Sequence, residues 1–344
     1  MSAEDKAGPG PVTVIGAGSW GTALAIHMAN AGSEVTLWGN EPEHMERLQK
    51  ERCNQQFIPD IPFPETLKIQ PSLELALKSA SWILLAIPSY VFRSFLAKAS
   101  VFIDKDTAVT WASKGLEEGT GKLLHQVVKE ELPQCSKFVV ISGPTFAREV
   151  ALGLPTAITV ASESEELANK ISHCLHHGNF RAYTSNDMVG VELGGALKNV
   201  LAIASGAADG LGFGANARAA LITRGLAELM RLGVVMGAHR ETFMGLAGMG
   251  DLVLTCTDNQ SRNRRMGLKL AEGLSKEEIK QQIGQEIEGV RTAREAMRLA
   301  EKYNVELPII EQVYKVLYEN LSPQEAVRQL LERKPGSEIV HDQH

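Results

Sequence analysis

The chain has 344 residues, longer than a single hydrophobic core usually grows, and this length favours two domains. Its content of 44% hydrophobic and 22% charged residues is typical of a folded globular protein and argues against disorder. With 41 acidic and 35 basic residues the net charge is -6, which argues against a nucleic acid as partner.

No segment predicts export or membrane insertion. The first eleven residues are polar and rich in Gly and Pro, so they lack the apolar core of a signal sequence, and we expect them to be flexible. The apolar run at 82–87 ends at Pro88, far short of the roughly 20 residues that a bilayer-spanning helix needs. We therefore expect a cytoplasmic protein without a transmembrane segment.

Cysteine and histidine spacing does not predict a metal site. The four cysteines lie far apart and form no C-x-x-C pair, so we expect free thiols. His173, His176 and His177 lack a neighbouring carboxylate or cysteine, and they close a charged helix just before Gly178. An exposed helix end is the better interpretation of these histidines.

The first half of the chain alternates short β-branched runs with helical patterns. This alternation indicates βα units and a mostly parallel sheet. The expected strands cover residues 12–15, 34–38, 82–87, 108–112, 138–142, 156–161 and 180–184. The stretch 57–71 contains four prolines, and we expect it to be loop.

Helix signals replace strand signals from about residue 188 onward. We therefore predict an α/β domain over 12–188, an all-helical domain over 189–334 and a flexible tail over 335–344. Ser275 with Glu278, and Ser322 with Glu325, fit capping boxes at helix starts. Gly233 is an expected helix stop.

A glycine-rich turn follows the first expected strand and opens a helix. In its sequence, Gly16-Ala17-Gly18-Ser19-Trp20-Gly21, Gly16 permits the tight turn, Gly18 lets a pyrophosphate approach the backbone, and Gly21 lets the helix pack closely on the strand. The helix N-terminus supplies free N–H groups for the phosphates. The order of strand, turn, helix and second strand favours a dinucleotide site over a plain structural turn.

The tip of the second strand bears on cofactor choice. It reads Leu37-Trp38-Gly39-Asn40 and contains neither the acid typical of NAD-selective sites nor an arginine that would bind a 2′-phosphate. Glu34 lies at the start of this strand and Glu41 one residue beyond Asn40. We expect NADP(H) and/or NAD(H) as cofactor, with the preference left open.

Two polar segments follow the fourth and fifth expected strands. Lys114 lies in the segment after the fourth strand. The fifth strand ends in Ser142-Gly143-Pro144-Thr145-Phe146-Ala147, and this segment begins a helix. Both lie at the carboxyl edge of the sheet, where open α/β sheets bind ligands. A solvated lysine and a simple packing turn are the alternatives.

A charged residue interrupts a helix that must be mostly buried. The run from Glu192 to Asn199 consists largely of small apolar residues but contains Lys198. Either Lys198 extends toward solvent or it faces an internal polar cavity, because an unpaired buried ammonium is costly. Burial would lower its pKa and suit it to proton transfer near neutral pH.

Two later segments complete the set of candidate site residues. The segment from Gly245 to Asp251 is predicted to be a flexible apolar loop that ends in an acidic residue. A second segment begins a helix at Ser261, which can cap it. Arg262 adds a forked cation and Asn263 a side-chain amide, and this combination suits a phosphate monoester. Arg264 and Arg265, which follow, we expect to be solvated.

Taken in order, these motifs resemble the NAD(P)-dependent glycerol-3-phosphate dehydrogenase family, bacterial type, from Val12 to about Arg333. The resemblance implies a Rossmann-type domain followed by a helical domain similar to that of 6-phosphogluconate dehydrogenase. It also implies reversible reduction of dihydroxyacetone phosphate to sn-glycerol 3-phosphate, at the start of glycerophospholipid synthesis.

The resemblance also assigns roles to residues. Those implied for the cofactor are Gly16, Gly18, Ser19, Trp20, Gly21, Asn40, Lys114, Ala147, Arg262, Glu286 and Glu288. Those implied for the substrate are Lys114, Gly143, Thr145, Lys198, Asp251, Ser261, Arg262 and Asn263. Asn40 stands where the family often has His or Arg, and Glu286 where it is often apolar, so both positions bear on cofactor affinity or choice.

Our hypothesis is that Lys198 donates a proton to the ketone oxygen while the nicotinamide delivers hydride. Lys114 would stabilise the alkoxide, Asp251 would orient the ammonium of Lys198, and Arg262 would hold the phosphate. A related dehydrogenase for a carboxylate substrate and a dinucleotide sensor without turnover are the alternatives. We expect a small-molecule substrate, no nucleic acid and no metal, and we leave a homodimer open.

Overall fold

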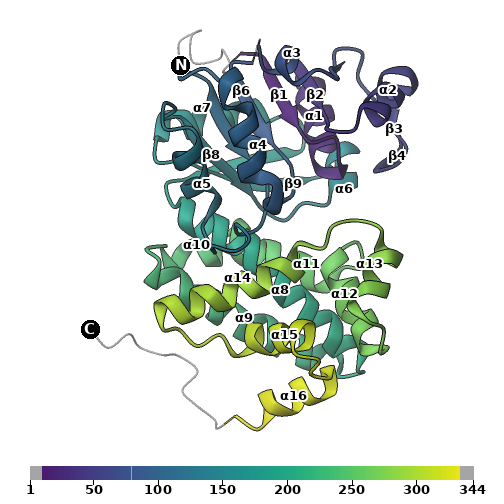
Figure 1. Cartoon of the computed structure of the whole chain (residues 1–344), viewed down its shortest axis with the longest axis vertical. Helices are drawn as coiled ribbons and strands as arrows, with labels where there is room; N and C mark the ends of the chain where they lie inside the picture. The colour runs from purple at the N-terminus through teal and green to yellow at the C-terminus, as the bar shows by residue number, and fades with distance from the viewer. Residues whose placement is uncertain (1–9, 79, 334–344) are drawn as a thin grey trace.

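Strands and helices are segregated into two lobes that follow each other along the chain. The computed structural model describes residues 10–78 and 80–333, and it places the strands in one lobe and only helices in the other (Figure 1). The tail at 335–344 and residues 1–9 of the N-terminal segment, both expected to be flexible, lie outside the described residues.

The first lobe is built on a mostly parallel sheet, as predicted. Its strand order is β10-β9-β8-β7-β6-β1-β2-β5, and every neighbouring pair is parallel except the antiparallel pair β8 and β9. The strands are β1 (Val12–Ile15), β2 (Val35–Trp38), β5 (Lys68–Ile69), β6 (Trp82–Leu85), β7 (Ala108–Trp111), β8 (Phe138–Ser142), β9 (Thr156–Ala161) and β10 (Phe180–Ser185). The central strands are buried on both faces, which explains their continuous apolar sequences.

Helices cover both faces of this sheet. One apolar core lies under α1 (Ser19–Asn30), α6 (Ala147–Ala151) and α7 (Glu165–Leu175). A second core, on the opposite face, lies under α3 (Leu73–Lys78), α4 (Phe92–Ala99) and α5 (Leu124–Glu131). Short 3₁₀ turns at η2 (Ser89–Val91) and η3 (Ser100–Phe102) flank α4. The parallel strands therefore end at one common edge, from which the functional loops emerge.

The expectation that 57–71 is entirely loop is wrong. After α2 (Pro42–Glu51), the short strands β3 (Cys53–Asn54) and β4 (Ile58–Pro62) pair antiparallel, and β5 joins the large sheet at its edge. Prolines are tolerated in β4 because its only partner among the described strands is the two-residue β3, so few of its backbone N–H groups are needed for pairing.

The second lobe is all-helical and surrounds one long helix, α8 (Met188–Gly210) (Figure 1). The other elements are α9 (Gly214–Val235), α10 (Arg240–Met244), the π-helical turn η4 (Leu246–Gly250), α11 (Asp251–Thr257), α12 (Arg262–Ala271), α13 (Lys276–Ile283), α14 (Glu288–Tyr303), α15 (Pro308–Tyr318) and α16 (Pro323–Leu331). α8 has a length and composition that could cross a membrane, but 89% of its most apolar window is buried inside the lobe. Its apolar sequence is therefore explained by its central place in the core.

Helix ends follow the sequence signals in part. Ser275 and Glu278 form the predicted capping box, whereas Ser322 caps α16 but Glu325 binds Arg328 instead of returning a bond. Gly233 does not stop α9, which continues to Val235. A Cβ at Gly233 would lie 2.2 Å from the Phe243 ring, so this glycine serves close packing.

Candidate functional site

The glycine-rich turn after β1 has the geometry of a pyrophosphate cradle. Gly16 has φ of +113°, and a Cβ there would lie 2.6 Å from the Ala86 carbonyl oxygen. A Cβ on Gly21 would lie 1.9 Å from the Gly16 oxygen, so this position requires glycine for packing. At Gly18, by contrast, a Cβ would meet nothing within 4 Å, so the backbone there faces open space. This is the surface that a dinucleotide phosphate needs.

The start of α1 is available to an anion. Gly18 is the N-cap, and no side chain caps the free backbone donors. The indole Nε1 of Trp20 is buried and has no hydrogen-bond partner in the described part of the chain, while the Ser19 hydroxyl donates to the Phe57 carbonyl at 3.2 Å. The Pro-rich segment therefore packs beside this turn. Together these features fit the phosphates of NAD(P), since an uncapped helix start attracts negative charge.

The remaining residues expected on the sheet side of the cofactor lie at the same edge. Asn40 is exposed two residues beyond the end of β2, and half-buried Ala147 is the first residue of α6.

Two lysines from different lobes share one buried carboxylate. Lys198 of α8 and Lys114, from the segment after β7, bind opposite oxygens of Asp251, Lys198 to Oδ1 and Lys114 to Oδ2 at 2.8 Å. Lys114 also donates to the Gly143 carbonyl at 2.9 Å. The side chain of Lys198 is 7% exposed and that of Asp251 1%, so the predicted burial of Lys198 is confirmed. This cluster lies where the two lobes meet.

The surroundings of Lys198 lower the pKa of its ammonium group. Burial lowers its pKa to about 8, and the nearby positive charge of Lys114 acts in the same direction, whereas Asp251 opposes both. A lysine with this pKa exists in both protonation states near neutral pH, which suits general acid–base chemistry.

The segment from Gly245 to Asp251 is not the flexible loop expected. Residues 246–250 form the π-helical turn η4, and Asp251 starts α11. One turn further, Thr255 accepts a hydrogen bond from Lys198 at 3.0 Å. Sequence reasoning missed Thr255, although its i+4 spacing from Asp251 places both on one helix face.

The residues expected to bind the substrate phosphate lie at the start of α12. Ser261 caps this helix by accepting from the Arg264 N–H, and Arg262 donates to the Glu286 carbonyl at 2.8 Å. Asn263 donates to the side chain of Asn199 at 2.9 Å and accepts from the Gly289 N–H at 3.0 Å. Asn263 thus ties α12 to α8 and α14 and keeps one amide proton for a ligand.

The expectation that Arg264 is solvated is wrong. Arg264 is buried, and its guanidinium binds Asp209 at 2.5 Å and Asn259 at 3.1 Å. Arg265 is partly buried, and its Nε lacks a partner among the described residues.

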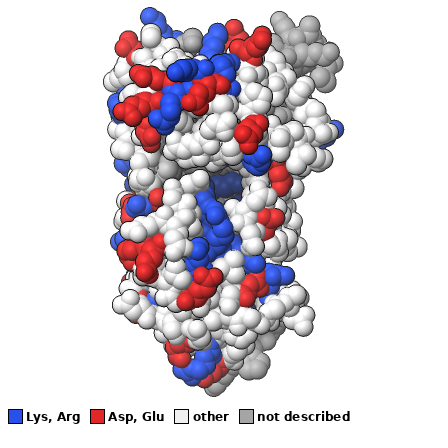
Figure 2. Space-filling view, turned by 90° about the vertical axis from the view of Figure 1, so that its right-hand side faces the viewer, with Lys and Arg blue, Asp and Glu red and all other residues white. Residues whose placement is uncertain are grey.

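Figure 2 shows a hollow between the lobes with basic side chains at its floor and directly below it. The face with this hollow therefore suits anionic ligands.

Glu288 binds the opposite lobe. Its carboxylate accepts from the Ser89 N–H at 3.0 Å and from the Ser89 hydroxyl at 2.7 Å, and burial raises its pKa. Glu286 instead pairs with Arg291 at 3.2 Å. Ser89 was not predicted, although it directly follows Pro88 at the carboxyl end of β6, the edge at which ligands bind.

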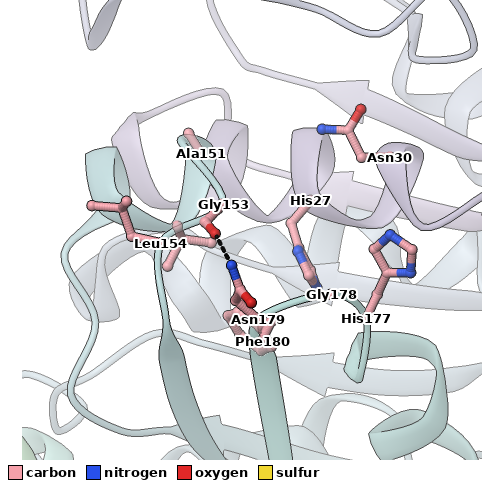
Figure 3. Close-up of a pocket in the computed structure, with 10 residues that line it drawn as sticks. His27, Asn30, Ala151, Gly153, Leu154, His177, Gly178, Asn179 and Phe180 are labelled. Atoms are coloured by element: carbon pink, nitrogen blue, oxygen red, sulfur yellow. Dashed lines mark hydrogen bonds between the residues drawn. The ribbon is translucent and has the colours of Figure 1, made fainter.

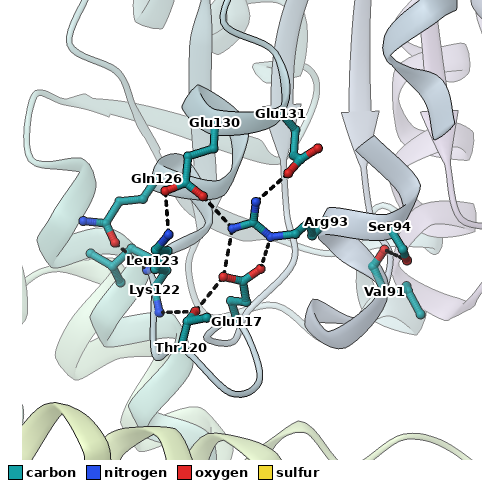
Figure 4. A network of polar contacts seen from close by, with 10 residues as sticks. All are labelled: Val91, Arg93, Ser94, Glu117, Thr120, Lys122, Leu123, Gln126, Glu130 and Glu131. Carbon is teal, nitrogen blue, oxygen red and sulfur yellow. Dashed lines mark hydrogen bonds and ion pairs between the residues drawn. The ribbon is translucent and has the colours of Figure 1, made fainter. Parts of the chain in front are cut away.

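The segment that carries Lys114 is anchored further along by Arg93. The guanidinium of Arg93 binds Glu117 at 2.5 Å, Glu130 at 2.6 Å and Glu131 at 2.5 Å (Figure 4). Arg93 and Ser89 line one pocket of about 390 Å³.

Another pocket, of about 220 Å³, lies at the far end of α1 and is lined by His27, Asn30 and Phe180 (Figure 3). It is separate from the residues described above.

A glycine-rich turn of the dinucleotide-binding type in one lobe and a buried lysine in the other agree with the class of protein, which is a two-lobed NAD(P)-dependent oxidoreductase. Family models described as the NAD-dependent glycerol-3-phosphate dehydrogenase N-terminus and C-terminus match residues 11–168 and 187–328. The chain belongs to this family.

Individual relatives agree with this assignment. The chain is 52% identical over 332 residues to glycerol-3-phosphate dehydrogenase [NAD(P)+] of Sodalis glossinidius, covering 96% of this chain and 98% of that one. It is 51% identical over 333 residues to the Yersinia pestis (strain Pestoides F) protein of the same name, with the same coverage.

Solved structures show the same fold. The glycerol-3-phosphate dehydrogenase of Coxiella burnetii superposes with a TM-score of 0.91 at 49% identity, covering 94% of this chain and 99% of that one. The corresponding Saccharomyces cerevisiae enzyme gives 0.81 at 28% identity, covering 94% and 100%.

Proposed function

We propose that the chain catalyses reversible hydride transfer between NAD(P)H and dihydroxyacetone phosphate to give sn-glycerol 3-phosphate, with Lys198 as general acid and base. The single observation that carries this proposal is the buried pair of Lys198 and Lys114 on Asp251. Membership of the glycerol-3-phosphate dehydrogenase family supports the substrate. We also propose that the product serves glycerophospholipid synthesis and that the enzyme works in the cytoplasm.

Lys198 would move the proton. The nicotinamide of the bound cofactor supplies hydride to C2 of the ketone. The ammonium of Lys198 donates a proton to the developing C2 alkoxide, and in the reverse direction its free amine takes the proton from the alcohol. Asp251 and Thr255 fix the direction of the amine through their two hydrogen bonds.

Lys114 would stabilise the charge that forms on the C2 oxygen. Its ammonium is held by Asp251 and the Gly143 carbonyl, so it is positioned before the substrate arrives. Because its charge also disfavours the ammonium form of Lys198, it promotes proton donation by Lys198.

Arg262, Ser261 and the remaining amide proton of Asn263 would hold the substrate phosphate. An arginine beside a helix start provides both a forked charge and backbone donors. Binding at the phosphate, remote from C2, supplies energy that fixes the reacting geometry. Gly143 and Thr145 would border the substrate from the sheet lobe.

The test is Lys198→Met, assayed in both directions with NADH and with NADPH. We expect turnover with dihydroxyacetone phosphate to fall by about 10²-fold or more, because a positioned acid is lost. Cofactor affinity, measured separately by fluorescence, should be retained. Near-normal turnover of the variant would remove Lys198 from the reaction, and a wild-type enzyme inactive on dihydroxyacetone phosphate would refute the substrate.

A further inference from the structure

A second buried carboxylate joins the lobes close to the two lysines but contacts neither of them. Glu192 lies on α8, and its side chain is 2% exposed. It accepts from the indole Nε1 of Trp111 at 3.1 Å and from the backbone N–H of His125 at 2.9 Å. Its other oxygen lies 2.5 Å from His125 Nδ1, which must carry the proton because a carboxylate only accepts. Three donors from the sheet lobe thus fix one side chain of the helical lobe.

These contacts connect the elements that carry the catalytic groups. Trp111 is the last residue of β7, and Lys114 follows three residues later. Glu192 lies on the same helix as Lys198, six residues before it. The distance between the two ammonium groups therefore depends on how α8 sits against the end of β7, which is where Glu192 acts.

The packing of α8 at this junction is close enough to transmit such a constraint. A Cβ on Gly195 would lie 2.8 Å from the Ser142 hydroxyl and 3.5 Å from Cγ of Lys114, and one on Gly194 would lie 2.5 Å from the Ala247 oxygen. The helix therefore touches β8 and the Lys114 segment at Gly195, and η4 at the adjacent Gly194. A small shift of α8 would be felt at Lys114 and Lys198 alike.

We infer that Glu192, bound by Trp111 and His125, is a positioning residue that sets α8 against β7 and thereby holds Lys198 and Lys114 at their working separation on Asp251. It acts through these two lysines and touches no reacting atom. The inference rests on the proposed role of Lys198. A misplacement of about 1 Å in a reacting group can cost on the order of 10²-fold in rate, so losing the hydrogen bonds of Glu192 should lower the reaction rate measurably.

The first test compares Glu192→Gln with Glu228→Gln. Glu228 is a second buried carboxylate of the helical lobe, and its hydrogen-bond donors among the described residues are the N–H groups of Ile309 and Ile310, neither of which is a site residue. We expect Glu192→Gln to lower kcat about 10-fold or more while the KM for the cofactor changes less than about twofold. Glu228→Gln should alter the Tm and leave kcat unchanged.

The pH profile supplies a readout that loss of stability alone would not move. Among the described residues, the charged groups that face Lys198 are Asp251 and Lys114, and the titratable thiol of Cys256, whose pKa is raised by burial, also interacts with Lys198. In Glu192→Gln, a looser junction admits water to Lys198 and moves Lys114 away, so the apparent pKa that limits ketone reduction should rise. In Glu228→Gln it should stay at the wild-type value.

A matched pair at His125 keeps the inference testable if Glu192→Gln fails to fold. His125→Leu removes the side-chain donor, whereas the amide of His125→Asn can take the place of Nδ1–H. We expect reduced kcat and a raised apparent pKa in the Leu variant, with recovery in the Asn variant. Equal kcat in these two variants, or a wild-type kcat and pH profile in folded Glu192→Gln, would overturn the inference. Lys198→Met, assayed alongside, separates the two claims, because an active Met variant would instead refute the role of Lys198.

Discussion

At the residue scale, the proposed recognition of the substrate phosphate depends on Arg262. We expect Arg262→Ala to lower kcat/KM for dihydroxyacetone phosphate by about 10²-fold or more, because a charge-assisted contact to the phosphate is lost. Activity with unphosphorylated dihydroxyacetone should fall far less. Lys269→Ala, in the last turn of the same helix, is the control and should match the wild type. Equal losses on both ketones would contradict the assignment.

The candidate site could be predicted from the sequence where a residue type conflicts with its surroundings. Lys198 is a charge in an otherwise apolar helix, and Lys114 follows a buried strand, so both attract attention without a structure. Thr255 and Ser89 are ordinary in their local sequence, and only the tertiary fold brings them to Lys198 and Glu288. Arg264 was misjudged for the same reason, because its partner Asp209 lies 55 residues earlier.

At the element scale, two glycines of the turn between β1 and α1 should have different effects, one on cofactor binding alone and the other also on stability. Gly18 has φ of -78°, which alanine also adopts, and an added Cβ would enter open space. We expect Gly18→Ala to keep the wild-type Tm but to weaken NADH and NADPH binding about 10-fold, because the methyl group occupies the phosphate position. The measurement is a cofactor titration by fluorescence alongside a thermal melt.

Gly21→Ala provides the contrasting variant in the same turn. Its Cβ would lie 1.9 Å from the Gly16 oxygen, so α1 must shift away from β1. Overpacking of this kind costs about 1–3 kcal/mol, and we expect a lowered Tm as well as weaker binding. If Gly18→Ala bound the cofactor normally, the open space above Gly18 would not be the phosphate site.

Element types were predictable because the hydrophobic periodicity of this chain is clear. All seven expected strands are present, and the regular elements from Met188 to residue 333 are all helices. The failures lie where tertiary contacts override local signals. β4 forms despite its prolines because, among the described strands, it pairs only with the two-residue β3, and α9 continues through Gly233 because Phe243 packs on that glycine. The turn at 246–250 is helical, although its glycines suggested a loop.

At the scale of the whole molecule, stability should depend on pH through Glu228. Burial raises its pKa to about 7 from 4.5, so the folded state binds this proton more tightly than the unfolded state does. Its contribution is therefore favourable at low pH and is lost as the pH rises from about 4.5 to about 7. The loss is on the order of 3 kcal/mol.

Urea unfolding of the wild type and Glu228→Gln between pH 4.5 and 8 measures this effect. The stability of the wild type relative to the variant should fall across this range, because glutamine does not titrate. A difference in unfolding free energy that stays constant with pH would show that Glu228 remains ionised in the folded protein.

Four of the polar contacts that join the two lobes involve candidate site residues or their neighbours. Asp251 binds Lys114, Glu288 binds Ser89, Glu192 binds His125, and Arg291 binds Glu118. Each contact links a segment at the carboxyl edge of the sheet to α8, α11 or α14. The side chains that hold the lobes together are therefore, in the proposed mechanism, also those that position the reacting groups.

The central claim is that one buried amine donates the proton in one direction and accepts it in the other. The pH dependence of kcat, measured in both directions on the same enzyme, tests it most directly. With the pKa of Lys198 at about 8, ketone reduction should decline as the pH rises above 8, and alcohol oxidation should increase through the same range. Profiles that are flat between pH 7 and 9, or that change in the same sense in both directions, would contradict the account.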